Sequence, residues 1–122
     1  MEAAGAGPTV LVVDDDPALR LLCRVNLELE HYRVLEAATL EEATAALVSE
    51  PIDVVLLDIH VGREDGRLFL RDIRAQGNAV PVALFTGSSE VTEDESELAG
   101  AVLPKPFALE ELTAVVGRLS GR

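Results

Sequence analysis

Five polar side chains in this sequence have the types needed to hold a cation and a phosphoryl group. Asp14 and Asp15 directly follow one apolar run, and Asp58 directly follows another. Thr86 directly follows a third run, and Lys105 follows a fourth run after one proline, Pro104. Carboxylate oxygens are preferred ligands of Mg²⁺, whereas a hydroxyl and an ammonium can neutralise phosphoryl oxygens. Because a carboxylate can also act as a nucleophile, these residues would suit phosphoryl transfer if they converge.

Charge repulsion gives the acidic residues a reason to bind metal. Asp14, Asp15 and Asp58 would repel one another if held close together, and a divalent cation would relieve this repulsion. An all-oxygen set favours Mg²⁺, with Mn²⁺ as a second possibility. The alternative is that these acids merely end strands and begin turns. Asp16 already supplies an N-cap acid, so helix capping does not account for the pair before it.

The elements that must position these side chains alternate along the chain. Short apolar runs predict five strands, at Thr9–Val13, Arg33–Leu35, Val54–Leu57, Val82–Phe85 and Ala101–Leu103. Val54–Leu57 is apolar throughout, which is typical of a strand buried on both faces of a parallel sheet. A helical pattern follows each strand, so we expect an α/β fold. Ligands of such folds bind at the carboxyl ends of the strands, where the five polar side chains stand.

The first predicted helix begins after Asp16, with Pro17 at its first position. Two sets of apolar residues follow, namely the helical stripe Ala18, Leu22, Val25 and Leu29, and the additional residues Leu19, Leu21, Cys23 and Leu27. We expect a helix buried on much of its circumference, with Cys23 inert in the core.

The other helices have weaker or clearer end signals. Thr39 and Glu42 have capping-box spacing at the start of the second helix. The third is predicted to run from about Arg67 to Gln76, with Gly77 after its end. The fourth lies somewhere in Val91–Leu98, and the last carries an apolar stripe over residues 109–119.

Composition excludes several classes of function. The 122 residues suit one domain, predicted over residues 9–122 after a flexible tail at 1–8. The net charge of −12 disfavours direct binding to nucleic acid or to an anionic membrane. A lone cysteine, the lack of a signal-peptide pattern and the lack of a long apolar run favour a cytoplasmic protein.

Taken together, these motifs resemble the receiver domain of two-component response regulators. The matches are Val12-Val13-Asp14-Asp15, Val54-Val55-Leu56-Leu57-Asp58, Asp65-Gly66, Phe85-Thr86 and Leu103-Pro104-Lys105-Pro106-Phe107. The resemblance implies a doubly wound (βα)5 flavodoxin-like sandwich with a parallel five-stranded sheet in the order 2-1-3-4-5.

The resemblance also implies a role for each site residue. Asp58 would be the phosphoacceptor. Asp15, Asp58 and the backbone carbonyl of His60 would bind Mg²⁺ directly, and Asp14 would act through water. Thr86 would hydrogen-bond the phosphoryl group and move when it arrives. Lys105 would pair with that group, and the bond between Lys105 and Pro106 would be cis.

Partners follow from the same resemblance. The donor would be a phosphohistidine on a sensor histidine kinase or a histidine phosphotransfer protein, which the family docks on the first helix. A downstream protein, or an output domain outside this chain, would read the result. The chain would catalyse its own phosphorylation and dephosphorylation, so we expect a signalling protein and not an enzyme that turns over a substrate.

The sequence departs from the family pattern near the site. Gly62 replaces a usual Pro, so we expect a looser loop over Ile59–Glu64. Val102 replaces the usual aromatic switch residue, and Gly87 replaces the usual Ala after the threonine. The acidic stretch Glu90–Glu97 is predicted to be a solvated face.

Two rim positions could tune the lifetime of the acyl phosphate. His60 and Ser88 each stand two residues after a site residue. They could equally be ordinary exposed loop residues. His60 could titrate near neutrality and make that lifetime depend on pH.

Two other functions remain open at this point. One is a receiver-fold interaction module that phosphorylation does not switch, which the missing aromatic at Val102 motivates. The other is a haloacid-dehalogenase-like phosphatase, because Asp14 and Asp16 form a strand-end Asp-x-Asp.

Overall fold

A five-stranded parallel sheet forms the centre of the protein. The computed structural model describes residues 7–87 and 91–121. The strands of the sheet are β1 (Thr9–Val13), β2 (Arg33–Ala37), β3 (Val54–Asp58), β6 (Val82–Thr86) and β7 (Gly100–Pro104). Their order is β2-β1-β3-β6-β7. This confirms the predicted order 2-1-3-4-5, since β4 and β5 belong to a separate small hairpin.

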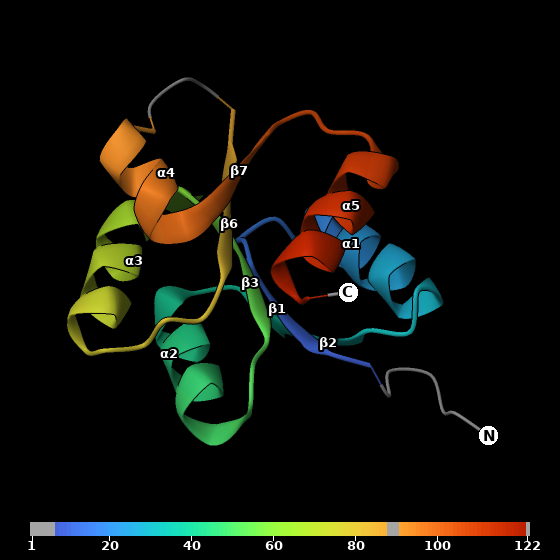
Figure 1. The fold of residues 1–122 in the computed structure, drawn as a ribbon, viewed down its shortest axis with the longest axis horizontal. Coiled ribbons are helices and arrows are strands. Elements are labelled where there is room, and N and C mark those ends of the chain that lie inside the picture. The colour runs from blue at the N-terminus through green and yellow to red at the C-terminus, as the bar shows by residue number, and fades with distance from the viewer. Residues whose placement is uncertain (1–6, 88–90, 122) are drawn as a thin grey trace.

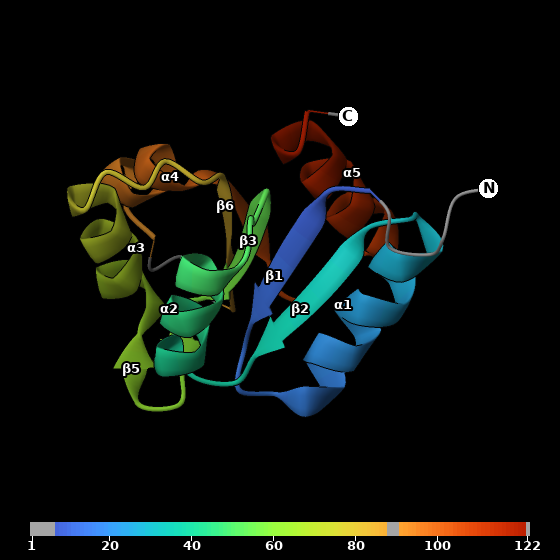
Figure 2. The same cartoon turned by 90° about the horizontal axis from the view of Figure 1, so that it is seen from below.

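Helices cover both faces of the sheet (Figure 1). One face carries α1 (Pro17–Leu29) and α5 (Leu109–Leu119), and the other carries α2 (Leu40–Ser49), α3 (Gly66–Ala75) and α4 (Glu93–Ala99) (Figures 1 and 2). Every residue of β1, β3 and β6 is buried, as expected for strands covered on both faces. The doubly wound fold is therefore confirmed. Within residues 7–87 and 91–121, none of the helices has the length and apolarity to cross a membrane.

Helix α1 packs through a different stripe from the main one predicted. Cys23 and Leu27 are fully buried, and Leu19 packs against the same core. The side chains that face solvent form an outer stripe, with exposed fractions of 58% for Leu21, 44% for Leu22, 47% for Val25 and 69% for Leu29. Burial around much of the circumference was therefore wrong. Helix α5 and the sheet cover one side of α1, and they leave the outer stripe uncovered.

Helix N-termini are stabilised by the capping residues that the sequence contains. The Thr39 hydroxyl accepts a hydrogen bond from the Glu42 amide at 3.1 Å, but the Glu42 carboxylate accepts from Ala38, one residue before the cap. A complete capping box occurs instead at α4, between Thr92 and Glu95. Glu95 is only 8% exposed, so the prediction of a solvated acidic face is wrong at this residue. Glu90 of the same stretch lies outside the described residues.

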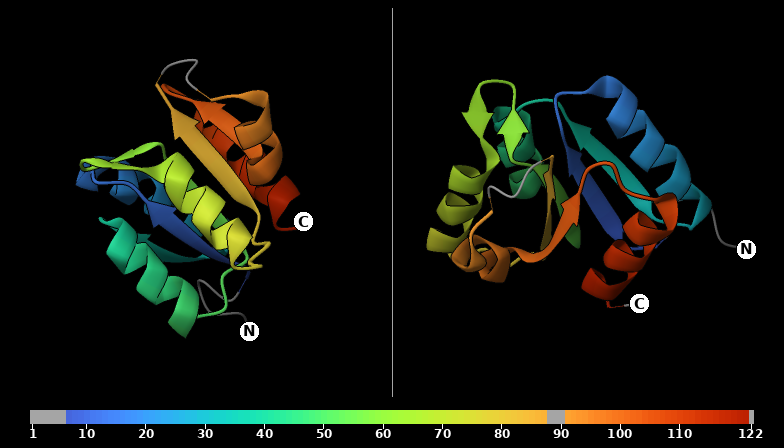
Figure 3. Two further views of the ribbon diagram at one scale, coloured as in Figure 1. Left: turned by 90° about the vertical axis from the view of Figure 1, so that its left-hand side faces the viewer. Right: turned by 90° about the horizontal axis from the view of Figure 1, so that it is seen from above.

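The segment after β3 forms a hairpin and not a loose loop. Strands β4 (His60–Val61) and β5 (Glu64–Asp65) pair antiparallel around a two-residue turn. Gly62 has a φ of +63° at the first central position of that turn. A type II′ hairpin turn requires a glycine there, which accounts for the departure from the family's Pro. The hairpin lies beyond the carboxyl ends of the main strands, beside α3 (Figures 2 and 3).

Part of the expected N-terminal tail is attached to the fold. The Gly7 amide donates to the His31 carbonyl at 2.8 Å, and the Arg33 amide donates to the Pro8 carbonyl at 3.0 Å. Residues 1–6 of the predicted tail lie outside the described residues.

Candidate functional site

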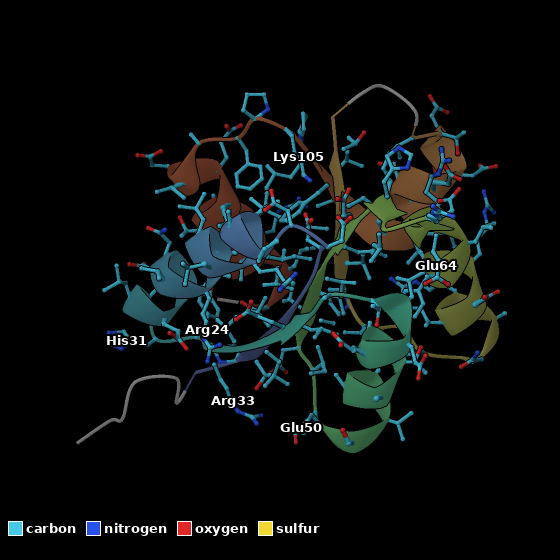
Figure 4. All side chains as sticks on the ribbon, turned by 180° about the vertical axis from the view of Figure 1, so that it is seen from behind. Arg24, His31, Arg33, Glu50, Glu64 and Lys105 are labelled. Carbon is cyan, nitrogen blue, oxygen red and sulfur yellow. The ribbon has the colours of Figure 1, made fainter. Side chains whose placement is uncertain are left out.

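Side chains from three strand ends meet at the carboxyl edge of the sheet. Asp14 follows β1, Asp58 ends β3, and Lys105 follows β7. The Lys105 Nζ lies 3.1 Å from Asp14 Oδ2 and 3.1 Å from Asp58 Oδ2. Figure 4 shows Lys105 reaching from the β7–α5 connection toward the ends of the strands. The predicted convergence of these three residues is therefore present in the structure.

Burial makes this cluster electrostatically strained. Asp14 is fully buried. Its pKa is raised, first by burial and then by the nearby charge of Asp58, although a hydrogen bond from the Asp16 amide and the charge of Lys105 oppose the rise. Burial alone would lower the pKa of Lys105, but Asp14 and Asp58 outweigh it, so the pKa of Lys105 is raised. The lysine thus acts as the internal cation of two carboxylates.

Backbone amides orient the same carboxylates. The Asp16 amide donates to Asp14 Oδ1 at 2.9 Å, and the His60 amide donates to Asp58 Oδ1 at 3.2 Å. Each buried acid therefore has one oxygen held by the backbone and the other paired with Lys105. This arrangement keeps both carboxylates directed at the same point.

The acidic residues fit a divalent cation. Carboxylate oxygens of Asp14, Asp15 and Asp58 lie within 4.8 Å of one another. Asp14 and Asp58 are buried, whereas Asp15 is exposed at the mouth of the cluster. Three carboxylates with an open side supply the hard oxygen ligands of Mg²⁺ and leave room for its waters. This set of donors therefore suits a divalent cation such as Mg²⁺.

Thr86 ends β6 beside this cluster, and its side chain is buried. The Thr86 carbonyl accepts a hydrogen bond of 2.6 Å from the Lys105 amide, which links the two residues through the backbone. The Lys105–Pro106 bond is cis, as predicted. Gly87 follows on the exposed side, and Ser88 lies outside the described residues.

Val102 lines a pocket between β7 and α4. The pocket has a volume of about 520 Å³, and Thr86, Gly87, Val91 and Lys105 also contribute to its wall. Val102 itself is half-buried. The position where the family places an aromatic side chain therefore borders open space in this protein.

Two features close to the site were not predicted. The Arg20 Nη1 donates to the Asp14 carbonyl at 2.7 Å. Gly66 lies so close to the Asp58 backbone that an added Cβ would collide with the Asp58 carbonyl oxygen. The motif Asp65-Gly66 was a signal for the second contact, but the sequence contained none for the first.

Asp16 would be the second carboxylate of the Asp-x-Asp motif in the haloacid-dehalogenase-like alternative, but the structure gives it another role. The Asp16 side chain accepts a hydrogen bond from the Ala18 amide at 2.9 Å and caps α1. The exposed Asp16 is therefore used by the helix terminus, while Asp14 is paired with Lys105.

Comparison with known proteins identifies the family. The family model described as "Response regulator receiver domain" matches residues 10–117. The chain is 42% identical over 108 residues to the response regulator MprA of Mycolicibacterium vanbaalenii, a match that covers 86% of this chain and 47% of that protein. The chain thus spans about half the length of the curated relatives that it matches.

Solved structures agree with this match. The receiver domain of the Francisella response regulator 1452 has a TM-score of 0.87 and 27% identity, with coverage of 95% of this chain and 98% of that one. The response regulator TrrA of Thermotoga maritima, solved in complex with Mg²⁺-BeF, has a TM-score of 0.83 and 32% identity over 93% of this chain and 99% of that one. With these matches and the acidic cluster at the sheet edge, the chain belongs to the family of response regulator receiver domains.

Proposed function

We propose that Asp58 is the residue that carries the phosphoryl group in this receiver domain. The observation that carries this assignment is the position of Lys105 Nζ, 3.1 Å from both Asp14 and Asp58. Asp58 ends a buried strand, so its carboxylate is fixed, while one oxygen is held by the His60 amide. A fixed carboxylate beside a cation is suited to attack phosphorus and to have its product stabilised.

The metal would be held by residues of the same cluster. Asp15, Asp58 and the backbone carbonyl of His60 would bind Mg²⁺, with Asp14 acting through water and Mn²⁺ as a substitute. When bound, Mg²⁺ would neutralise charge that develops on the oxygens of the phosphoryl group. The clustering of three carboxylates within 4.8 Å supports this assignment.

The chain's own residues would carry out the rest of the transfer. A carboxylate oxygen of Asp58 attacks phosphorus, and the new O–P bond forms as the P–N bond of a phosphohistidine breaks. The bonding electron pair returns to the imidazole of the donor. Lys105 exchanges its contact with Asp58 for a phosphoryl oxygen, and the Thr86 hydroxyl donates to another. The lysine thereby follows the negative charge from the carboxylate to the phosphoryl group.

The donor would be a sensor histidine kinase or a histidine phosphotransfer protein, and it would dock on the outer stripe of α1. That stripe exposes Leu21, Leu22, Val25 and Leu29 as neighbouring aliphatic side chains. An uncovered apolar helix face is suited to pack against a helix of a partner. A downstream protein, or an output domain such as the remaining half of a longer regulator, would read the phosphorylated state. We place this exchange in the cytoplasm on the basis of composition.

Residues at the rim would set how long the phosphoryl group persists. His60 and Ser88 would control access of water to the acyl phosphate, and Gly87 would give freedom to the threonine before it. Because Val102 is not aromatic, the pocket beside it would change shape without the movement of an aromatic ring. We expect the chain to catalyse its own dephosphorylation as well as its phosphorylation.

Intact-protein mass spectrometry tests the acceptor directly. Wild type, incubated with Mg²⁺ and phosphoramidate, should gain the mass of one phosphoryl group, and Asp58→Ala should gain none. Asp72→Ala removes an exposed carboxylate of α3 and should behave as wild type. Labelling that persists in Asp58→Ala would mean that another residue is the nucleophile. No labelling of folded, Mg²⁺-bound wild type would favour a receiver-fold interaction module that phosphorylation does not switch.

A further inference from the structure

Arg20 connects helix α1 to the backbone of the acidic cluster. Its side chain is only 16% exposed. The Nη1 atom donates to the Asp14 carbonyl at 2.7 Å, and the Nε atom donates to Glu36 Oε1 at 3.1 Å. A guanidinium can hold two acceptors at once because its donors form a rigid planar fork. One side chain therefore links α1, the end of β2 and the turn after β1.

The Asp14 carbonyl belongs to the peptide that joins Asp14 to Asp15. Rotation of this peptide would move the two carboxylates relative to each other, because they leave the chain on either side of it. The Asp14 amide is held by the Ala37 carbonyl at 3.1 Å, and the Asp14 side chain is held by the Asp16 amide. The contact from Arg20 adds a charge-assisted hydrogen bond to the carbonyl, which is the stronger kind.

We propose that Arg20 is a positioning residue of the metal site. It fixes the Asp14–Asp15 peptide so that both carboxylates are oriented for Mg²⁺ before the ion arrives. This inference rests on the proposed function, because it presupposes that the acidic cluster binds Mg²⁺. Arg20 acts through the backbone and contacts no group that we assign to the reaction.

Glu36 orients Arg20, and Arg24 holds Glu36 from the other side. The Arg24 Nη1 donates to Glu36 Oε2 at 2.8 Å, and its Nε donates to Glu28 Oε2 at 3.3 Å. Both contacts lie along α1 and β2. In Figure 4, Arg24 is seen beside β2 and away from Lys105. Arg24 therefore shares the helix, the charge and the Glu36 partner of Arg20, but its contacts are with these side chains and not with the Asp14 carbonyl.

The sign of the effect separates positioning from simple charge. Removal of a positive charge near an acidic site should by itself tighten the binding of a cation. Loss of an orienting contact should weaken it, and groups that orient metal ligands are worth about 10- to 100-fold in affinity. Arg20→Ala removes both the charge and the orienting contact, so a positioning role predicts that the affinity for Mg²⁺ falls by about tenfold overall. Arg24→Ala removes the same charge and one partner of Glu36 but leaves the contact of Arg20 with the Asp14 carbonyl in place. Its Kd for Mg²⁺ should therefore stay within about twofold of wild type or fall slightly.

The experiment is isothermal titration of Mg²⁺ into the metal-free chain, with no phosphodonor present. Wild type, Arg20→Ala, Arg24→Ala, Glu36→Gln and Glu28→Gln are compared, and urea unfolding with a chelator checks the fold of each. Glu36→Gln keeps the size of the side chain, removes one negative charge and loosens Arg20. Glu28→Gln removes the same charge from a residue that pairs with Arg24 and not with Arg20, so Glu36→Gln should raise the Kd more than Glu28→Gln does. This pair of variants keeps the test decisive if Arg20→Ala does not fold.

The outcomes separate this inference from the function on which it rests. Unchanged or tighter Mg²⁺ binding by Arg20→Ala would overturn the positioning role alone, as would equal weakening by Arg20→Ala and Arg24→Ala. If Arg20→Ala does not fold, the role is overturned when Glu36→Gln binds Mg²⁺ as tightly as Glu28→Gln or more tightly. Failure of folded wild type to bind Mg²⁺ would overturn the metal site, and the positioning role with it.

Discussion

A methyl group added at Gly66 would test how strictly the structure holds the proposed acceptor. Gly66 is the first residue of α3, and its Cβ would collide with the Asp58 carbonyl oxygen. The obstacle is backbone, so it cannot swing aside as a flexible side chain would. Overpacking costs about 1–3 kcal/mol, and the replacement of glycine by alanine in a helix returns about 0.5–1 kcal/mol. We expect Gly66→Ala to lose about 1–2 kcal/mol of unfolding free energy.

The effect on chemistry should exceed the effect on stability. The clash must move either α3 or the end of β3, and Asp58 sits at that end. Misplacement of a reacting atom by about 1 Å costs about 100-fold in rate. The assay is the rate of phosphoramidate labelling at saturating Mg²⁺, followed by intact mass, together with urea unfolding.

Gly117→Ala is the matched control. Its added Cβ would meet only the Tyr32 hydroxyl, at 3.8 Å, inside α5. We expect a gain of about 0.5–1 kcal/mol in unfolding free energy and an unchanged labelling rate. The reasoning is refuted if Gly66→Ala labels at the wild-type rate, or if the two variants respond alike.

Three further predictions concern groups in or beside the site. Burial, followed by the charge of Asp14, raises the pKa of the Cys23 thiol to about 12. At pH 8 it should have about 1000-fold less thiolate than a thiol of pKa near 9, so iodoacetamide should label it slowly in the folded chain and rapidly in urea; fast labelling of folded protein would contradict this. Because the pKa of Asp14 is raised by burial and by Asp58, stability linked to its protonation is complete at low pH and is lost as the pH rises through the folded-state pKa. Without metal, Asp14→Asn should therefore be more stable than wild type at pH 7 by about 0.5–2 kcal/mol. This advantage should shrink on acidification in urea titrations with a chelator, and a constant difference would exclude the Asp14 carboxyl as its source. Finally, Mg²⁺ at tenfold its Kd should raise the unfolding free energy by about 1.4 kcal/mol. Asp15→Asn should remove most of that gain in thermal melts, and a full gain in this variant would show that Asp15 is not a ligand.

The main sheet and the cluster at its edge could be predicted because the two signals are local. An apolar run of strand length followed at once by a polar residue needs no knowledge of distant packing. Parallel topology then brings the ends of separate strands together, which is how Asp14, Asp58 and Lys105 meet. The residue types at the site and the pattern of the sheet can therefore both be predicted from the sequence.

Features that depend on tertiary choice could not be predicted. Helix α1 has two apolar stripes with the same periodicity, and only its packing against the sheet and α5 decides that Cys23 and Leu27 face the core while Leu29 does not. In the sequence, Glu95 is one of several acids in an acidic stretch. In the fold it is buried, and it forms a capping box with Thr92 and an ion pair of 3.3 Å with Arg71. The hairpin at Gly62 was not predicted, because a looser loop was expected where glycine replaces the family's usual Pro. Glycine is in fact the residue preferred at the first central position of a type II′ hairpin turn.

The lysine of the acidic cluster also has a consequence for synthesis. Lys105 pairs with Asp14, which lies 91 positions earlier in the chain, and with Asp58, which lies 47 positions earlier. As the chain leaves the ribosome, Asp14, Asp15 and Asp58 emerge before the cation that neutralises two of them in the finished fold. A nascent chain that lacks β7 would therefore carry repelling carboxylates at the edge of an incomplete sheet. Mg²⁺ in the cell would compensate this charge during elongation. The ion proposed for signalling would then also assist folding of the nascent domain.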